Sequence, residues 1–177
     1  MKAVIIMCLT EMISTKFGVS RLNQIYEKAN IPTTERQFFA TMDTPDENVL
    51  AIFNSTCDCL DLSPTQVGEL FGEYWCQEYV KNLYEAYFKS ASNAKDFLLK
   101  MKHIHSAVTQ KMSNSKPPHF DYEDTNPNKL IMKYSSDRNL QVIWYGLLKG
   151  VGMIFNEKLD IVILDENTVE ITFSKIN

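Results

Sequence analysis

The sequence has little of several features that mark common functional classes. Its 177 residues include six glycines, six prolines, four cysteines and three histidines. It has no phosphate-binding glycine loop, zinc motif or Ser-His-Asp arrangement, so the usual signatures of nucleotide hydrolases, zinc proteins and serine hydrolases are missing. The formal net charge is −4. With no cluster of Lys and Arg to bind phosphates, we expect no nucleic-acid partner.

Long hydrophobic runs are also missing, since no stretch reaches the ~20 apolar residues of a membrane-spanning helix. The opening MKAVIIMCLTEMI has a short apolar run that carries Thr10 and Glu11 and lacks a cleavage site. We therefore expect a cytoplasmic protein without membrane contact, whose cysteines stay reduced. Cys57 and Cys59 are interpreted as thiols rather than metal ligands, because residues two apart point to different sides of a helix.

What is present is the composition of a packed protein. Hydrophobic residues make up 45%, aromatic residues 11% and charged residues 23%, which predicts one domain over 1–177 with a sizeable core. The first part, up to about residue 116, has mainly helical patterns. Ser63, Pro64 and Gln66 form the signature of a helix start, which predicts a helix over 63–88. A second helix is predicted over 94–112.

The last part, about 117–177, changes character. HFDYED and KLIMKYSS are separated by the turn TNPN, which predicts a β-hairpin. NLQVIWYGLLKGVGMIF has helical spacing of its apolar residues, and LDIVIL followed by TVEITFSK predicts a second hairpin. The sequence thus predicts an α+β fold: a helical N-terminal subdomain followed by a four-stranded antiparallel sheet with a crossing helix, in the order ββαββ.

The predicted helix over 94–112 carries two histidines with different surroundings. His105 falls in an apolar stripe, four residues after Met101 and three before Val108, whereas His103 points away from that stripe. Such a histidine is either a core residue whose ring is satisfied by backbone or water, or the neutral axial ligand that a haem iron requires. The sequence leaves both interpretations open.

The segment MKYSSDRN contains a second group of candidate site residues, and it too has two interpretations. As a strand it places Tyr134, Ser136 and Arg138 on one face, beyond the apolar Leu130 and Met132. These residues are either the solvated end of a strand or a clamp for carboxylates, which a guanidinium and hydroxyls suit. A haem is a flat apolar ring with two carboxylates on one edge, and it matches this face.

The Tyr-x-Ser-x-Arg motif in YSSDR (134–138), the histidine in HIHSAVTQKM, and the segments KPPHFDYED, FGEYW, GLLKG and MKAVIIMCL together resemble the H-NOX family. H-NOX proteins are haem nitric oxide/oxygen-binding domains related to the haem domain of soluble guanylate cyclase. The resemblance covers essentially the whole chain. It implies a haem b between the two parts of the fold, with the metal bound by His105 and the propionates held by Tyr134, Ser136 and Arg138. Further cofactor contacts implied by the resemblance are Pro118, Met101, Ile5 and Leu147.

The resemblance also places the gas-binding side of the pocket at Ile5, Leu9, Trp75, Ile143 and Leu147. Oxygen-binding members carry a tyrosine at the position of Ile143, and isoleucine cannot donate a hydrogen bond. We therefore expect a nitric oxide sensor, not an enzyme, that binds nitric oxide and carbon monoxide and discriminates against dioxygen. Trp75 is the exception in this apolar wall, because its indole could donate.

The resemblance further implies that nitric oxide weakens the iron–histidine bond and shifts the two parts of the fold. A separate partner, a histidine kinase or a diguanylate cyclase or phosphodiesterase, would receive the signal. Two other classes compete with this hypothesis. One is a haem enzyme of the peroxidase or nitric oxide-consuming type, and the other is a haem-free module that binds a carboxylate ligand through Arg138.

Overall fold

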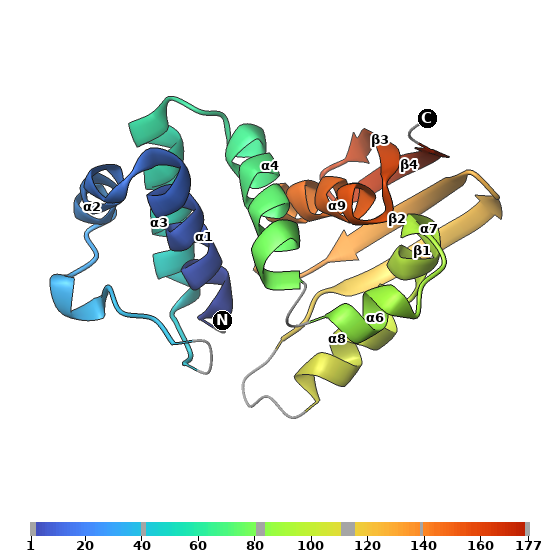
Figure 1. The fold of residues 1–177 in the computed structure, drawn as a ribbon, viewed down its shortest axis with the longest axis horizontal. Coiled ribbons are helices and arrows are strands. Elements are labelled where there is room, and N and C mark those ends of the chain that lie inside the picture. Colours follow the sequence, from blue (N-terminus) through green and yellow to red (C-terminus); the bar gives the residue numbers. More distant parts are fainter. Residues whose placement is uncertain (1–2, 40–41, 81–83, 111–115, 139, 176–177) are drawn as a thin grey trace.

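The computed structural model describes residues 3–39, 42–80, 84–110, 116–138 and 140–175. A group of helices lies at one end of the molecule and a sheet with its covering helices at the other (Figure 1). Within these described ranges, no helix combines the length and hydrophobicity that crossing a lipid bilayer requires. The predicted α+β class and the order of helical part, then sheet, are confirmed.

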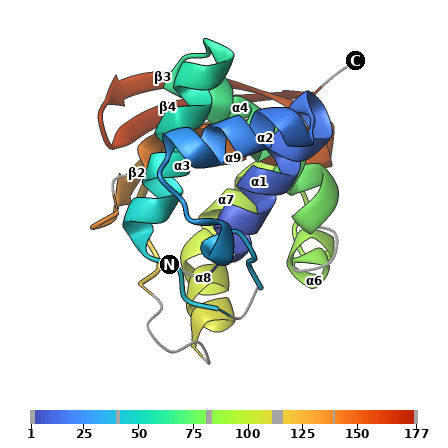
Figure 2. The ribbon, with the colours of Figure 1, turned by 90° about the vertical axis from the view of Figure 1, so that its left-hand side faces the viewer.

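The N-terminal part packs its helices around an apolar core, and α2 crosses in front of α1 and α3 (Figure 2). Its fully buried side chains include Ile6, Met12, Ile25, Ile52 and Phe71. The helices are α1 (Val4–Phe17), α2 (Val19–Lys28), the short 3-10 helix η1 (Thr33–Glu35), α3 (Asp46–Leu60) and α4 (Pro64–Tyr74).

The predicted helix start at Ser63 is confirmed, but the helix does not continue regularly to 88. Ser63 Oγ accepts a hydrogen bond from the amide of Gln66 at 3.2 Å, and the Gln66 side chain accepts one from the amide of Ser63 at 2.8 Å. After α4 the chain widens into a π-helical turn, η2 (Trp75–Tyr79). Residues 81–83 lie outside the described ranges, and the short α6 (Glu85–Lys89) follows.

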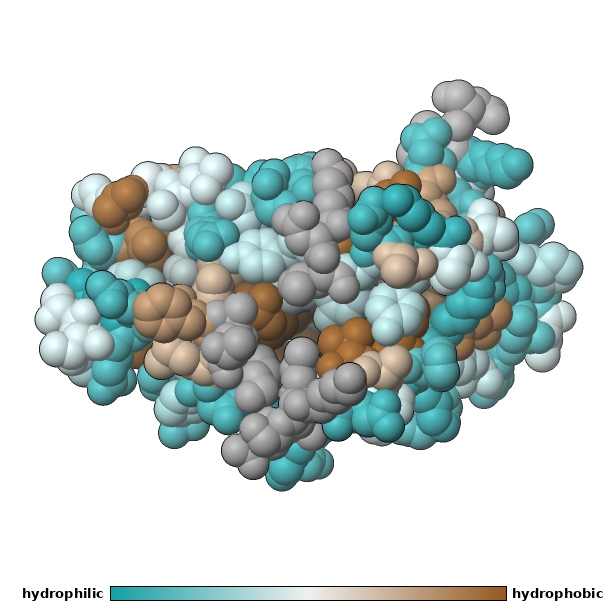
Figure 3. Space-filling view, turned by 60° about the horizontal axis from the view of Figure 1, so that its bottom comes forward, coloured by the Kyte–Doolittle hydropathy of each residue, from teal (hydrophilic) through white to brown (hydrophobic). Residues whose placement is uncertain are grey.

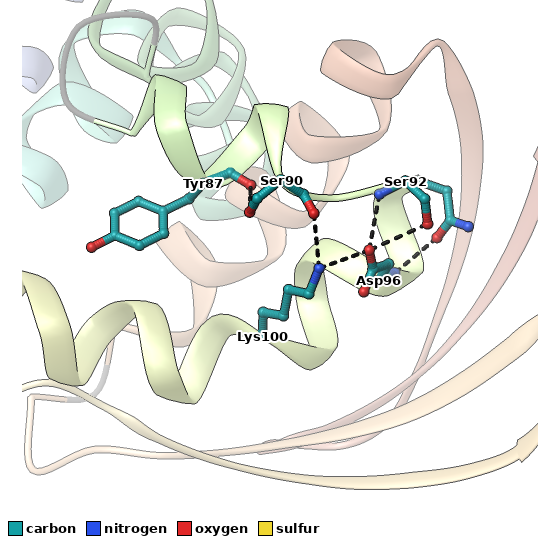
Figure 4. Close-up of polar contacts among 6 residues, drawn as sticks. Tyr87, Ser90, Ser92, Asp96 and Lys100 are labelled. Carbon is teal, nitrogen blue, oxygen red and sulfur yellow. Dashed lines mark hydrogen bonds and ion pairs between the residues drawn. The ribbon is translucent and has the colours of Figure 1, made fainter.

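The helix predicted over 94–112 is two helices, α7 (Ala94–Leu99) and α8 (Met101–Thr109), with a break at Lys100. Lys100 Nζ donates to Asp96 Oδ2 at 2.9 Å and to the carbonyl of Ser90 at 3.0 Å (Figure 4). Asp96 also accepts a hydrogen bond from the amide of Ser92. These bonds fasten the break to the chain that precedes it. Residues 111 and 112 lie outside the described ranges.

The C-terminal part is the predicted ββαββ arrangement, with antiparallel strands in the spatial order β1-β2-β4-β3. One face of the sheet is buried under α7, α8 and the crossing helix, through a cluster that includes Phe120, Leu130, Met132 and Ile171. The elements are β1 (His119–Asn126), β2 (Lys129–Ser135), α9 (Gln141–Phe155), β3 (Glu157–Asp165) and β4 (Thr168–Lys175).

Helices α4 and α9 join the two parts at a crossing lined by glycine. A Cβ atom at Gly72 would overlap the backbone of Gly146, and one at Gly146 would overlap the backbone of Gly68. Gly150 faces Cys76 and the carbonyl of Gly72 in the same way. Because the helix backbones touch, any larger residue here would push the helical part and the sheet part away from each other.

Candidate functional site

A cavity of about 250 Å³ lies between the two parts of the fold. Its walls come from α1, η2, α6, α7, α8, β1, β2 and α9, together with residues just after η2, just before α6 and β1, and after β2. Most of the lining is aliphatic or aromatic. Figure 3 shows hydrophobic residues gathered around a hollow on the face of the molecule turned toward the viewer. The site is therefore an apolar cavity, of the kind that holds a small organic ligand.

The cavity brings together nearly all the residues that the sequence proposes for a site. Leu9 is the exception: it is fully buried in the N-terminal core, and the described cavity wall does not include it. The predicted residues that line the cavity are Ile5, Trp75, Met101, His105, Pro118, Tyr134, Ser136, Arg138, Ile143 and Leu147.

His105 lies in the middle of α8, with its ring 5.5 Å from that of Phe120. Its Nδ1 atom is buried and has no hydrogen-bond partner among the described residues. Burial lowers the pKa of His105 from 6.5 to about 4, so the imidazole is neutral at physiological pH. A neutral imidazole facing an apolar cavity is suited to bind a metal. His103, two residues earlier, is exposed, as its position on the helix predicts.

Tyr134, Ser136 and Arg138 all line the cavity, but only Tyr134 lies on a strand as the sequence predicts. Strand β2 ends at Ser135, so Ser136 and Arg138 lie in the turn that follows it rather than on the strand face with Tyr134. The amide of Arg138 donates to Ser136 Oγ at 3.2 Å, which closes this turn. Burial raises the pKa of Tyr134, so its hydroxyl keeps its proton and can donate.

The guanidinium of Arg138 is held in place by two groups from other segments. Its Nε donates to Asp46 Oδ2 at 2.8 Å, and its Nη1 donates to the carbonyl of Lys116 at 3.1 Å. Burial acts to raise the pKa of Asp46, but hydrogen bonding and charge pairing that include Arg138 outweigh it and keep that pKa below its ordinary value. Asp46 begins α3, far from Arg138 in sequence, and no local pattern could have revealed it.

Trp144 is a second residue that sequence reasoning missed. It lines the cavity from α9, and its ring stacks on Tyr134 with centroids 5.0 Å apart and planes 17° apart. The Nε1 atom is buried and finds no partner anywhere in the described part of the chain. Its position directly after the predicted pocket residue Ile143 was the only sequence signal available.

The residues present fit a flat apolar cofactor with acidic groups. One part of the cavity offers a neutral imidazole, and another offers a guanidinium and two hydroxyls. No group of three or more His, Cys, Asp or Glu side chains converges within the described ranges. A metal held by His105 would therefore have to bring most of its ligands with it, as an iron porphyrin does.

The sequence model of the Haem-NO-binding family matches residues 2–163. This chain belongs to the haem-NO-binding family. Among curated protein sequences, none matches it. Its fold is that of H-NOX proteins of known structure, which are 18–20% identical to it in the three cases described below.

The Fe(II) unliganded H-NOX protein from K. algicida has 19% identity and a TM-score of 0.85, with 100% of this chain and 97% of that chain covered. The Fe(II)NO form of an H-NOX protein from S. oneidensis has 20% identity and a TM-score of 0.85, with both chains fully covered. The oxygen complex of an oxygen-binding H-NOX domain related to soluble guanylate cyclases has 18% identity and a TM-score of 0.78, with 99% and 96% covered.

Proposed function

We propose that this chain is a haem-based nitric oxide sensor in which His105 binds the iron and Tyr134, Ser136 and Arg138 hold the propionates. The observation that carries the proposal is the single cavity that His105 shares with these three residues. A bound haem b supplies a ferrous iron that coordinates diatomic gases. Pro118 and Met101 line the same cavity and would pack against the macrocycle.

The surroundings of His105 favour a weak bond between its imidazole and the iron. In many haem and zinc sites the second ring nitrogen donates to a carboxylate or carbonyl, which makes the imidazole a stronger ligand. Nδ1 of His105 has no such acceptor among the described residues. Without such a bond the imidazole would be a neutral ligand that donates weakly to the iron. On this proposal His105 would hold the iron weakly enough for nitric oxide to release it, and α8 would then move.

The choice of gas depends on the apolar wall made by Ile5, Ile143 and Leu147. None of these side chains can donate a hydrogen bond to a bound gas, whereas dioxygen gains from a donor and nitric oxide needs none. Solved relatives of the same fold include both a nitric oxide form and an oxygen complex, so the fold itself does not decide. We infer binding of nitric oxide and carbon monoxide and discrimination against dioxygen.

A sensing role fits this cavity better than catalysis. Apart from His105, the described cavity wall contains no His, Asp or Glu that could serve as a second acid–base group for peroxide chemistry. We infer that residues 1–177 work as one haem domain in the cytoplasm. The domain would regulate a separate signalling partner, such as a histidine kinase or a diguanylate cyclase or phosphodiesterase.

The test is an absorption spectrum of the haem-loaded, reduced protein, alone and with nitric oxide, carbon monoxide and air. We expect a strong Soret band that His105→Gly abolishes and that added imidazole restores. His103→Gly is the matched control, because it changes an exposed histidine on the same helix. An unchanged five-coordinate ferrous spectrum in His105→Gly would show that another residue binds the iron.

A further inference from the structure

Trp144 has a buried hydrogen-bond donor, its indole Nε1–H. The side chain is 5% exposed, and none of the described residues accepts a hydrogen bond from its Nε1–H. Buried polar groups in folded proteins are nearly always paired, so each exception needs an explanation. In the part of the chain that the structure describes, two other buried polar side-chain atoms share this state, Nδ1 of His105 and the hydroxyl of Tyr122.

The position of Trp144 indicates where its acceptor comes from. Aromatic rings surround the indole: Tyr134 stacks on it at 5.0 Å, Tyr145 lies at 5.2 Å and Phe120 at 6.3 Å between centroids. The side chain also forms part of the cavity wall, whereas that of Tyr122 does not belong to the described wall. An acceptor for Trp144 can therefore be provided by a molecule that occupies the cavity.

A cofactor with two carboxylates would present more hydrogen-bond acceptors than Arg138 alone can serve. A guanidinium has five N–H donors. The Nε–H is directed to Asp46, and one N–H of Nη1 is directed to the Lys116 carbonyl. Two carboxylates present four oxygens, each able to accept two hydrogen bonds. A further donor beside Tyr134 would therefore have an acceptor within this group.

We propose that the Nε1–H of Trp144 donates a hydrogen bond to a carboxylate oxygen of the cofactor, as a fourth anchor beside Tyr134, Ser136 and Arg138. This inference rests on the proposed haem function. It assigns Trp144 a recognition role for the acidic edge of the cofactor in addition to its role in packing. An indole suits this role because its rigid ring fixes the direction of its single N–H donor.

The experiment compares haem with haem dimethyl ester, which has the same ring but lacks the carboxylate charge. Trp144→Phe keeps an aromatic ring against Tyr134 and removes the donor. We expect this variant to lose native haem to excess apomyoglobin about five to ten times faster than the unmodified chain. Its loss of the dimethyl ester, whose neutral carbonyl oxygens are weaker acceptors than a carboxylate, should be accelerated much less. Equal acceleration for both cofactors would assign Trp144 to packing only and overturn the proposal.

The matched control is Tyr145→Phe. Tyr145 is the next residue on α9, its ring contacts Trp144, and its hydroxyl donates to the carbonyl of Glu166 at 3.1 Å. We expect haem loss from this variant to equal that from the unmodified chain for both cofactors. If Tyr145→Phe speeds the loss of native haem alone to the same extent, the donor effect does not belong to Trp144.

A second measurement uses the unmodified chain and does not depend on a variant that folds. The chain has two tryptophans, so an ¹⁵N-labelled sample gives two indole N–H signals. We expect the Trp144 signal to lie further downfield with zinc protoporphyrin IX than with its dimethyl ester, since the ring current is the same in both. Identical positions would overturn the proposal. If the chain binds neither porphyrin nor haem, the proposed function fails and this inference with it.

Discussion

Nε of Arg138 lies 2.8 Å from Oδ2 of Asp46 and thereby connects the turn after β2 to the first turn of α3. The two residues are 92 positions apart in sequence. The guanidinium that we assign to the cofactor is thus oriented by the N-terminal part, while Tyr134 and Ser136 belong to the C-terminal part. Residues from both parts of the fold therefore contribute to the carboxylate clamp that we propose.

Replacing Asp46 tests whether this pairing orients Arg138. The Arg138 side chain is 17% exposed and that of Asp46 38%, so we expect Asp46→Asn to cost about 1 kcal/mol of unfolding free energy or less. Haem should be lost several-fold faster, because the guanidinium is no longer fixed. Glu170→Gln is the control, since it removes an ion pair with Lys129 on the sheet. Equal haem loss in the two variants would contradict an orienting role for Asp46.

The glycine-lined crossing of α4 and α9 predicts a large effect from one added methyl group. A Cβ at Gly146 would overlap backbone atoms of Gly68, which cannot rotate away as a side chain could. We expect Gly146→Ala to destabilise the protein by about 1–3 kcal/mol or more, measured by urea unfolding. Glu69→Gln, which alters the neighbouring ion pair with Lys149 at the surface, should cost less than about 1 kcal/mol. A wild-type urea midpoint for Gly146→Ala would contradict the observed closeness of the helices.

The lowered pKa of His105 predicts acid sensitivity of the haem-free protein. Its pKa is about 4 in the folded state and about 6.5 in the unfolded state. Between these values the unfolded chain takes up a proton that the folded chain does not, so stability falls as pH falls. From pH 7 to pH 5 this group should account for a loss of about 2 kcal/mol. His105→Gln should reduce the measured loss by that amount, and an undiminished pH dependence would mean that other groups cause it.

Introducing a hydrogen-bond donor at position 143 tests the basis of gas selectivity. Ile143 is buried in the cavity wall and cannot hydrogen-bond to a ligand. We expect Ile143→Tyr, loaded with haem and reduced, to give a long-lived oxygenated spectrum in air that the unmodified chain does not give. Ile143→Phe supplies a similar ring without the hydroxyl and should behave like the unmodified chain. A stable oxygenated spectrum in the unmodified chain would mean that another donor, with Trp75 the first candidate, already acts in the pocket.

Local patterns predicted much of this fold because each depends on neighbouring residues. The capping box at Ser63, the two hairpins and the apolar spacing of α9 all follow from short-range chemistry, and the structure has them. The break at Lys100 was missed because helical spacing continues across it, and the hydrogen bonds that Lys100 donates to Asp96 and Ser90 depend on the preceding chain. The π-helical turn at Trp75 gives no distinct signal in the sequence.

In the candidate site, too, some residues could be found from local sequence patterns and others could not. His105 and Arg138 could be selected from the sequence because their residue types and spacing match a known motif. Asp46 could not, because its contact with Arg138 exists only after the two parts of the chain have packed. The orphaned donor of Trp144 was equally invisible, since a sequence does not show which polar atoms stay unpaired.

The break at Lys100 has a mechanical consequence. It leaves His105 in the middle of a nine-residue helix, which is about 14 Å long. Hydrogen bonds from Lys100 fasten the near end of this helix to the turns before it. A force applied through the imidazole would therefore act on a short helix whose first end is fastened to the preceding chain, rather than on a long helix that could bend along its length.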